Sequence, residues 1–257
     1  MPAKTGKLTA VLLPPVLFGA AFVLLGETRI LHALLRVTEV QLPKTSSIMR
    51  VIVENFPRIV RDSWVTLQVF WAGIAIGCAA GFLTAIFATV FPRWGVGALT
   101  VISACNAIPI VALSPILRLW FSGSAFAAKT AVVAIVSMVA MSVNAYRGLT
   151  DLKPFALDLM ESYAATKPAI FFKLRLPNCL PYIFIALRIN IAAAMIGVII
   201  SEYFAASVEG LGFVIRNSLR TTQLTTGWAY ILVASLLGIL FFMLISFLEK
   251  KLMKNRG

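Results

Sequence analysis

The segment TDLKPFALDLMESYAATKPAIFFKLRLPNCLPYIFIALR, residues 150–188, joins two long apolar runs and determines the organisation of this 257-residue chain. Connections between membrane helices are usually short, so a polar-containing segment of this length needs a function of its own. Its apolar residues recur at helical spacings, and Pro154 and Pro168 stand where short helices can begin. Its basic residues place it on the cytoplasmic side. The segment predicts a helix-turn-helix outside the bilayer, whose apolar face either packs on the chain's own helices or binds a partner.

The composition is that of an integral membrane protein. Hydrophobic residues make up 60% of the chain and charged residues 13%, and the mean hydropathy is +0.92; soluble domains do not have such values. The net charge of +13 could suggest nucleic-acid binding. However, the basic residues lie mostly between the apolar runs, which favours membrane orientation and contact with anionic lipid instead.

The apolar runs predict an all-α protein with about six transmembrane helices. The runs are residues 8–25, 63–90, 96–121, 125–145, 180–206 and 227–248. With the N-terminus inside, the cytoplasmic segments carry 12 Lys and Arg against 8 in the outer segments. The positive-inside rule therefore favours cytoplasmic positions for both termini.

Two parts are expected along the chain. Residues 1–62 would form an N-terminal membrane helix and an external connection, in which residues 46–62 form an amphipathic helix bent at Pro57. Residues 63–257 would form a core of five membrane spans that includes the cytoplasmic segment 147–179. The sole histidine, His32, is expected to be a solvated loop residue because no second histidine accompanies it.

The third run contains two prolines that must kink or unwind its helix, so we expect it to line a translocation path. Kinking for packing alone is the alternative. The fifth run contains polar residues at membrane depth, which face a bundle interior, a partner or the interface. The candidate path residues in the two runs are Asn106, Pro109, Ser114, Pro115, Arg188, Asn190 and Glu202.

Three glycines at four-residue intervals, Gly73, Gly77 and Gly81, form a smooth stripe along the second run. Small residues at this spacing allow two helix backbones to approach closely in lipid. We therefore predict that the stripe packs against a neighbouring helix.

Catalytic and metal-binding motifs are absent from the sequence. There is no G-x-x-x-x-G-K-[ST] loop, no H-E-x-x-H motif and no histidine in an apolar run. The three cysteines do not have the spacing of metal ligands. The chain is thus expected to be non-catalytic, without a cofactor of its own.

Residues 158–177 resemble the cytoplasmic EAA signature of the membrane subunits of bacterial ABC importers, E-A-A-x3-G-x9-I-x-L-P. Aligned on Leu176-Pro177, the sequence has Asp-Leu-Met at the E-A-A positions, Ala164 at the glycine and Leu174 at the isoleucine. An alanine at a position that usually has positive φ brings the geometry of this turn into question.

The wider sequence resembles the permeases of nitrate, sulfonate and taurine importers. This similarity is carried by residues 107–121, 176–188 and 201–212, and it extends over about residues 42–252. The run LMESYAA, residues 159–165, is most similar to the branch linked to thiamine-pyrimidine precursors or riboflavin.

The resemblance implies a transport subunit with separate partners. Two permease subunits, as a homodimer or a heterodimer, would form the path in the bacterial inner membrane. A dimeric ATPase would bind ATP and Mg²⁺ beneath them, and an external solute-binding protein would deliver the substrate. The residues expected to contact the ATPase are Asp158, Leu159, Met160, Glu161, Ala164, Ala165, Leu176 and Pro177. The alternative is a self-sufficient secondary transporter or channel, and the substrate stays open.

Overall fold

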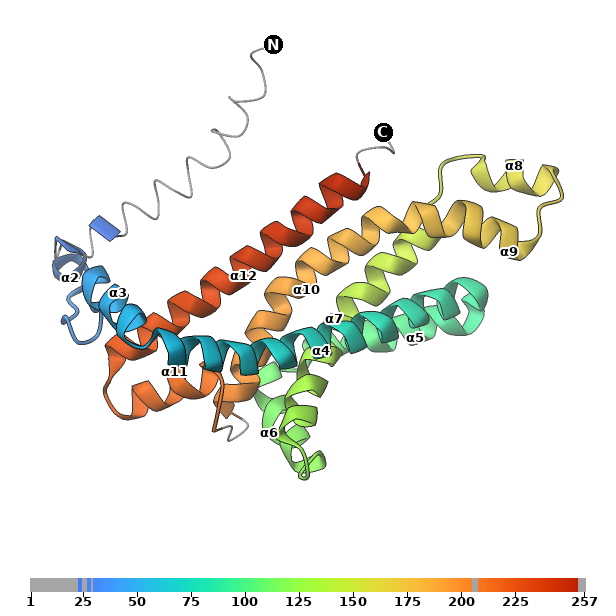
Figure 1. The fold of residues 1–257 in the computed structure, drawn as a ribbon. Helices are drawn as coiled ribbons and strands as arrows, with labels where there is room; N and C mark the ends of the chain where they lie inside the picture. The colour runs from blue at the N-terminus through green and yellow to red at the C-terminus, as the bar shows by residue number, and fades with distance from the viewer. Residues whose placement is uncertain (1–22, 25–26, 29, 205–207, 254–257) are drawn as a thin grey trace, which may run out of the picture. The chain divides into compact units, whose positions relative to one another are not determined.

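The computed structural model describes residues 23–24, 27–28, 30–204 and 208–253, and every element within these ranges is helical (Figure 1). The elements are α2 (Ile30–Leu35), α3 (Thr45–Glu54), α4 (Phe56–Val90), α5 (Pro92–Ala104), the 3-10 turn η1 (Cys105–Ala107), α6 (Ile110–Trp120), α7 (Ala125–Thr150), α8 (Ala156–Ser162), α9 (Lys167–Ile170), the π-helical turn η2 (Phe171–Arg175), α10 (Leu176–Phe204), α11 (Leu211–Arg220) and α12 (Leu224–Met253). The all-α prediction is confirmed.

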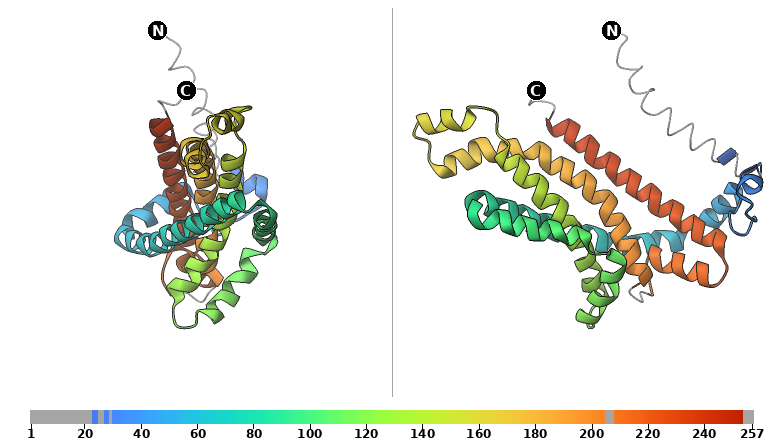
Figure 2. Two further views of the ribbon diagram at one scale, coloured as in Figure 1. Left: turned by 90° about the vertical axis from the view of Figure 1, so that its right-hand side faces the viewer. Right: turned by 180° about the vertical axis from the view of Figure 1, so that it is seen from behind.

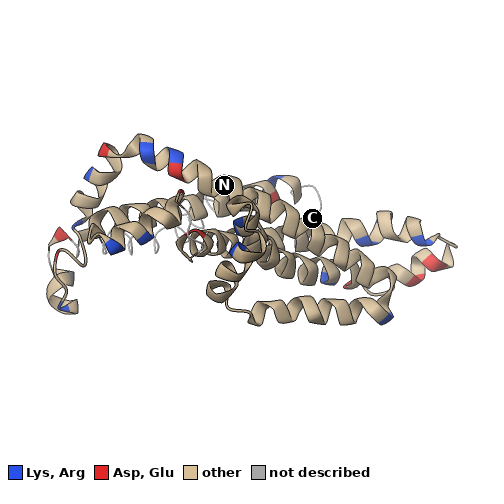
Figure 3. Cartoon of the chain, turned by 90° about the horizontal axis from the view of Figure 1, so that it is seen from below, with Lys and Arg blue, Asp and Glu red and all other residues tan. Residues whose placement is uncertain are grey.

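Four helices are long and apolar enough to cross a membrane: α4, α7, the continuous helix Lys167–Phe204 and α12. The pair Pro92–Ala107 and Ile110–Trp120 is bent by 104° and counts as a fifth span if it crosses as one. In Figure 3 these helices show long stretches without charged residues. The expected first span, residues 8–25, lies almost wholly outside the described residues, so six spans stay a prediction.

Internal contacts divide the chain into two compact units. One unit contains Met1–Val60 and Val214–Leu232, and the other contains Arg61–Phe213 and Val233–Gly257. The first boundary lies close to the expected one at residue 62. Within the first unit, the Trp228 indole N–H donates to the Gln41 carbonyl oxygen at 3.0 Å and so links the two segments.

Two expectations about the N-terminal unit are wrong. His32 is only 8% exposed, and its Nε2 lies 2.6 Å from the Leu42 carbonyl oxygen, so it is a buried residue of α2. The helix break falls at Asn55 instead of Pro57. Proline fits the first turn of a helix, where its missing N–H has no acceptor to lose, and Pro57 accordingly lies at the second residue of α4.

The larger unit is built on α4, α7 and α10, with the C-terminal part of α12 packed beside them. One core cluster joins all four helices through Phe70, Val133, Ile191 and Ile245. A second cluster joins α4, α7 and α10 towards the α8–α9 end, where Cys179 is fully buried. Figure 2 shows α7 and α10 side by side, with α8 and α9 forming a hairpin beyond their ends.

The glycine stripe of α4 lies against α7. A Cβ on Gly73 would overlap the Val133 side chain, and one on Gly77 would overlap the Ala134 carbonyl oxygen. A Cβ on Gly81 would lie 3.0 Å from the Met141 Cβ. These glycines therefore allow the close helix contact that their spacing predicts.

Candidate functional site

The hairpin formed by α8 and α9 presents its apolar residues to the outside. No residue of α8 is buried. Phe155 is 81% exposed, Leu159 58% and Tyr163 79%. Of the two alternatives for this segment, its exposure favours a partner-binding surface over packing on the chain's own helices.

The end of α8 is a Schellman turn. The Ala164 N–H donates to the Glu161 carbonyl oxygen at 2.9 Å, and the Ala165 N–H donates to that of Met160 at 3.0 Å. Ala164 has φ +51°, the left-handed conformation that glycine usually supplies at this position. The turn geometry of the signature is thus kept although the glycine is replaced by alanine.

Replacing Ala164 with glycine should stabilise the purified chain by about 1 kcal/mol, because glycine has no steric cost at positive φ. Ala165→Gly is the matched control, since Ala165 does not have a positive φ and should gain nothing. Thermal unfolding in detergent would measure both. A loss of stability in Ala164→Gly would contradict the strained turn.

The second helix of the hairpin runs without a break into α10. Thr166 caps α9 by accepting from the Ala169 N–H at 3.4 Å, and Pro168 lies in the first turn. The chain then passes through the π-helical turn Phe171–Arg175 before α10 begins. Turns of this kind are rare and are frequent at functional sites.

The base of the hairpin is fastened to the end of α7. The Arg175 guanidinium donates to the Leu149 carbonyl oxygen at 2.7 Å. The Asn178 amide donates to the Gly148 and Asp151 carbonyl oxygens, both at 2.8 Å. Tyr182 adds a hydrogen bond from its hydroxyl to the Asp151 carboxylate at 2.8 Å. Both legs of the hairpin are therefore held at its base.

The predicted ATPase-contacting residues fall into two groups. Asp158, Leu159, Met160, Glu161, Ala164 and Ala165 lie together on α8 and its terminal turn, and Leu176 and Pro177 are half-buried in the first turn of α10. Two exposed aromatic residues flank α8: Phe155 belongs to the apolar face that the helical spacing predicts, whereas sequence reasoning did not assign Tyr163 to it. An aromatic side chain in a polar connection was the signal that could have indicated a contact residue. No sequence signal predicts the left-handed backbone conformation of Phe155, at φ +64°.

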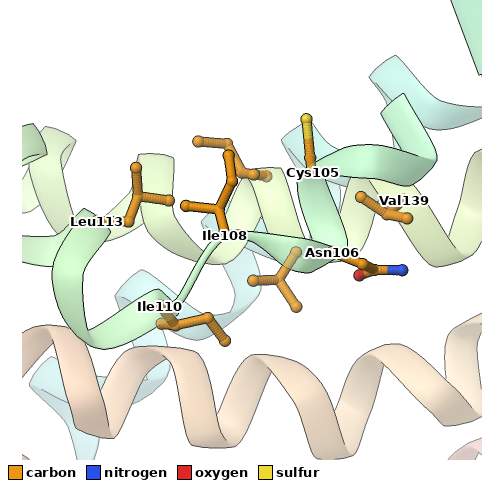
Figure 4. Close-up of a pocket in the computed structure, with 8 residues that line it drawn as sticks. Cys105, Asn106, Ile108, Ile110, Leu113 and Val139 are labelled. Atoms are coloured by element: carbon orange, nitrogen blue, oxygen red, sulfur yellow. The ribbon is translucent and has the colours of Figure 1, made fainter. Parts of the chain in front are cut away.

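The predicted break in the third run is confirmed by the bend between α5 and α6. Asn106 lies in η1, and Pro109 has extended backbone at the start of α6. Pro115 lies within α6 and does not end it. Cys105, Asn106 and apolar residues of α6 and α7 line a small cavity of about 50 Å³ at the bend (Figure 4).

The other predicted path residues are engaged in helix contacts. Ser114 is buried, and its hydroxyl donates to the Ser201 carbonyl oxygen at 3.4 Å. Asn190 is fully buried and donates to the Ser137 carbonyl oxygen at 3.0 Å. The Arg188 guanidinium lies 3.1 Å from the carboxylate of Glu249 in α12, a partner that the sequence did not reveal.

Glu202 belongs to a buried polar cluster at the end of the larger unit opposite the hairpin. It is fully buried, and its carboxylate lies 3.9 Å from the Lys129 ammonium group. It also accepts hydrogen bonds from the Thr66 hydroxyl at 3.0 Å and the Gly212 N–H at 2.9 Å. Among the described residues, no group of three His, Cys, Asp or Glu could hold a metal ion.

Residues 73–254 match the family model described as the binding-protein-dependent transport system inner membrane component. The chain is 32% identical to the formylaminopyrimidine transport permease protein ThiX of Halalkalibacterium halodurans over 191 residues, which are 74% of this chain and 76% of ThiX. It is 27% identical to a putative aliphatic sulfonates transport permease protein of Escherichia coli over 147 residues, which are 57% of this chain and 55% of that protein.

A solved structure of similar fold is an amino acid ABC transporter with histidines, with a TM-score of 0.64 at 16% identity over 78% of this chain and 96% of that one. The inward-facing MetNI methionine ABC transporter has a TM-score of 0.54 at 17% identity, over 74% and 97%. The family match and the helical fold agree on a non-catalytic, multi-pass inner-membrane protein. The chain belongs to the binding-protein-dependent transport system inner membrane components, the permease subunits of ABC importers.

Proposed function

We propose that α8 is the coupling helix through which an ATPase subunit drives this permease. The observation that carries the proposal is the exposure of its apolar residues, because Leu159, Phe155 and Tyr163 have no cover from the described part of the chain's own bundle. An apolar helix with aromatic flanks suits insertion into a groove of a partner. The ATPase binds ATP and Mg²⁺, and this chain binds neither.

The bend between α5 and α6 lines the path for the solute. Non-helical backbone at membrane depth is tolerated where protein buries it or a wet cavity adjoins it, and Asn106 and Pro109 are both exposed at the bend. Pro115 is exposed as well, and Ser114 is buried beside it. A second permease subunit, as a homodimer, would face this bend across the path.

Three of the predicted path residues join the helices that border the path to one another: Arg188, Asn190 and Glu202. Their partners lie on four other helices: Glu249 on α12, Ser137 and Lys129 on α7, Thr66 on α4 and Gly212 on α11. We assign them to holding the shape of the path instead of binding the solute.

Both termini lie in the cytoplasm, and the hairpin lies on the same side. The basic residues Lys153, Lys167, Lys173 and Arg175 of this segment support the assignment through the positive-inside rule. The solute-binding protein would then approach the opposite end, which contains the Glu202 cluster.

The solute is proposed to be an uncharged nitrogen heterocycle delivered by the binding protein. The chain is 32% identical to the formylaminopyrimidine permease, against 27% and 23% to the sulfonate permeases of E. coli and Bacillus subtilis, and a riboflavin permease is 29% identical over 125 residues. In addition, Lys129 and Arg188 are each paired with a carboxylate. Neither therefore presents an unneutralised positive charge to an anionic solute.

Purification of the intact complex in mild detergent tests the proposal. We expect two copies of this chain with two ATPase chains, and ATP-dependent uptake of labelled formylaminopyrimidine after reconstitution with the binding protein. Taurine and an alkanesulfonate serve as comparison solutes. Stable isolation without an ATPase would contradict the coupling role, and uptake of a sulfonate in preference to the pyrimidine would contradict the solute class.

A further inference from the structure

A buried junction joins four helices at the end of the larger unit opposite the hairpin. Lys129 comes from the start of α7, Glu202 from the end of α10, Thr66 from the start of α4 and Gly212 from the start of α11. The Glu202 carboxylate is 0% exposed, Thr66 is 0% exposed and Lys129 is 5% exposed. Removing two charged groups from water costs free energy, so a pair this deeply buried needs ion-pair and hydrogen-bond partners in fixed positions.

The junction holds the first turn of α11. The Gly212 N–H donates to the Glu202 carboxylate at 2.9 Å, and the Leu211 N–H donates to the Thr66 hydroxyl at 2.9 Å. These are N–H groups that a helix start leaves without an intrahelical acceptor. The Thr66 hydroxyl also contacts the Glu202 carboxylate, so residues of both α4 and α10 hold the start of α11.

The backbone packs tightly around the Glu202 carboxylate, and two glycines make this close approach possible. Gly210 has φ +98°, and a Cβ added to it would overlap the Glu202 carboxylate. A Cβ on Gly212 would overlap the Ile199 carbonyl oxygen of α10. The second acidic group nearby, Asp62, is 4% exposed, interacts electrostatically with Glu202 and lies 4.0 Å from the Arg61 guanidinium.

We propose that the Lys129–Glu202 pair is a permanent fastening that makes the ends of α4, α7 and α10 and the start of α11 move as one block during transport. The inference goes beyond the proposed function and uses from it only that transport requires helix movement. The pair stays closed because opening it would leave two buried charges without a partner, and a shift of Glu202 would also free the Gly212 N–H. Glu202 and Lys129 are positioning residues, and neither touches the solute.

Variants that remove the charges of Glu202 and Lys129 distinguish a structural role of the pair from a role in binding the solute. Glu202→Gln and Lys129→Met should each lower uptake at least about tenfold, because each leaves one buried charge without its partner. The double variant should recover uptake to within about threefold of the parent, since glutamine still accepts from Gly212 and neither member of the pair is left as an unpaired buried charge. The melting temperature of the purified chain should follow the same pattern.

A double variant as defective as the single variants in both uptake and melting temperature would overturn the fastening. The melting temperature does not depend on transport, so it decides the question even if the complex takes up no solute. Loss of all uptake in the parent complex would instead contradict the proposed function.

A disulfide tests whether the junction stays closed. The hydrogen bond between Thr66 and Leu211 places their Cα atoms at most about 7 Å apart, near the range of a disulfide. Thr66→Cys and Leu211→Cys are combined in a chain whose three native cysteines are replaced by alanine. Uptake should be the same, within about twofold, in the oxidised and reduced forms. Loss of uptake on oxidation, reversed by reduction, would show that the junction opens and would overturn the proposal.

Discussion

Uptake should fall by about a hundredfold when Leu159 is replaced with glutamate, while the chain stays folded in the membrane. Leu159 lies in the middle of α8 and is 58% exposed, so a glutamate there is solvated in the free chain. In the complex the same position would be enclosed by the ATPase. Burying an unpaired charge at a central contact costs about 3 kcal/mol or more, which corresponds to this loss.

The measurement is the initial rate of ATP-dependent uptake in proteoliposomes, together with the amount of ATPase that co-purifies. Leu34→Glu is the matched control, because Leu34 is 74% exposed and lies in α2, outside the hairpin. It should leave both quantities near those of the parent. Equal uptake in the Leu159 variant and the control would contradict the assignment of α8 as the coupling helix.

Replacing Gly77 with alanine should lower the free energy of unfolding by about 2–3 kcal/mol. The added Cβ would overlap the Ala134 carbonyl oxygen and lie 2.8 Å from the Ser137 Cβ, so α4 and α7 must move apart. Backbone atoms cannot rotate away as a flexible side chain would. The result would be seen as a lower melting temperature of the detergent-solubilised chain.

Gly97→Ala in α5 provides the control for this experiment. A Cβ at Gly97 has no neighbour within 4 Å, and alanine favours a helix over glycine by about 1 kcal/mol. This variant should therefore be at least as stable as the parent. Equal effects of the two substitutions would mean that the glycine stripe does not set the distance between α4 and α7.

Local sequence pattern was sufficient for the long helices and the hairpin. Continuous apolar runs predicted α4, α7, α10 and α12, and Pro109 predicted the break between α5 and α6, because each of these signals acts within a few residues. The EAA resemblance located α8. These features need no knowledge of which helices are neighbours.

The polar partners could not be predicted, because they depend on how distant helices meet. Lys129 and Glu202 are separated by 73 positions, and Glu249 comes 61 positions after Arg188, just beyond the last apolar run. His32 was placed in solvent because its acceptor, the Leu42 carbonyl, is a backbone group without a sequence signature. The helix break lies at Asn55 because Pro57 fits the first turn of the following helix and does not interrupt it.

In the coupling role proposed for α8, the bonds at the base of the hairpin would determine how a displacement of this helix reaches the membrane. With Arg175 and Asn178 bonded to the last carbonyls of α7, the loop between the two long helices behaves as a braced joint and not as a flexible strap. A strap would absorb a displacement by bending. A braced joint has little compliance, so in the coupling role proposed for α8 a displacement at the base of the hairpin would move the ends of α7 and α10 together.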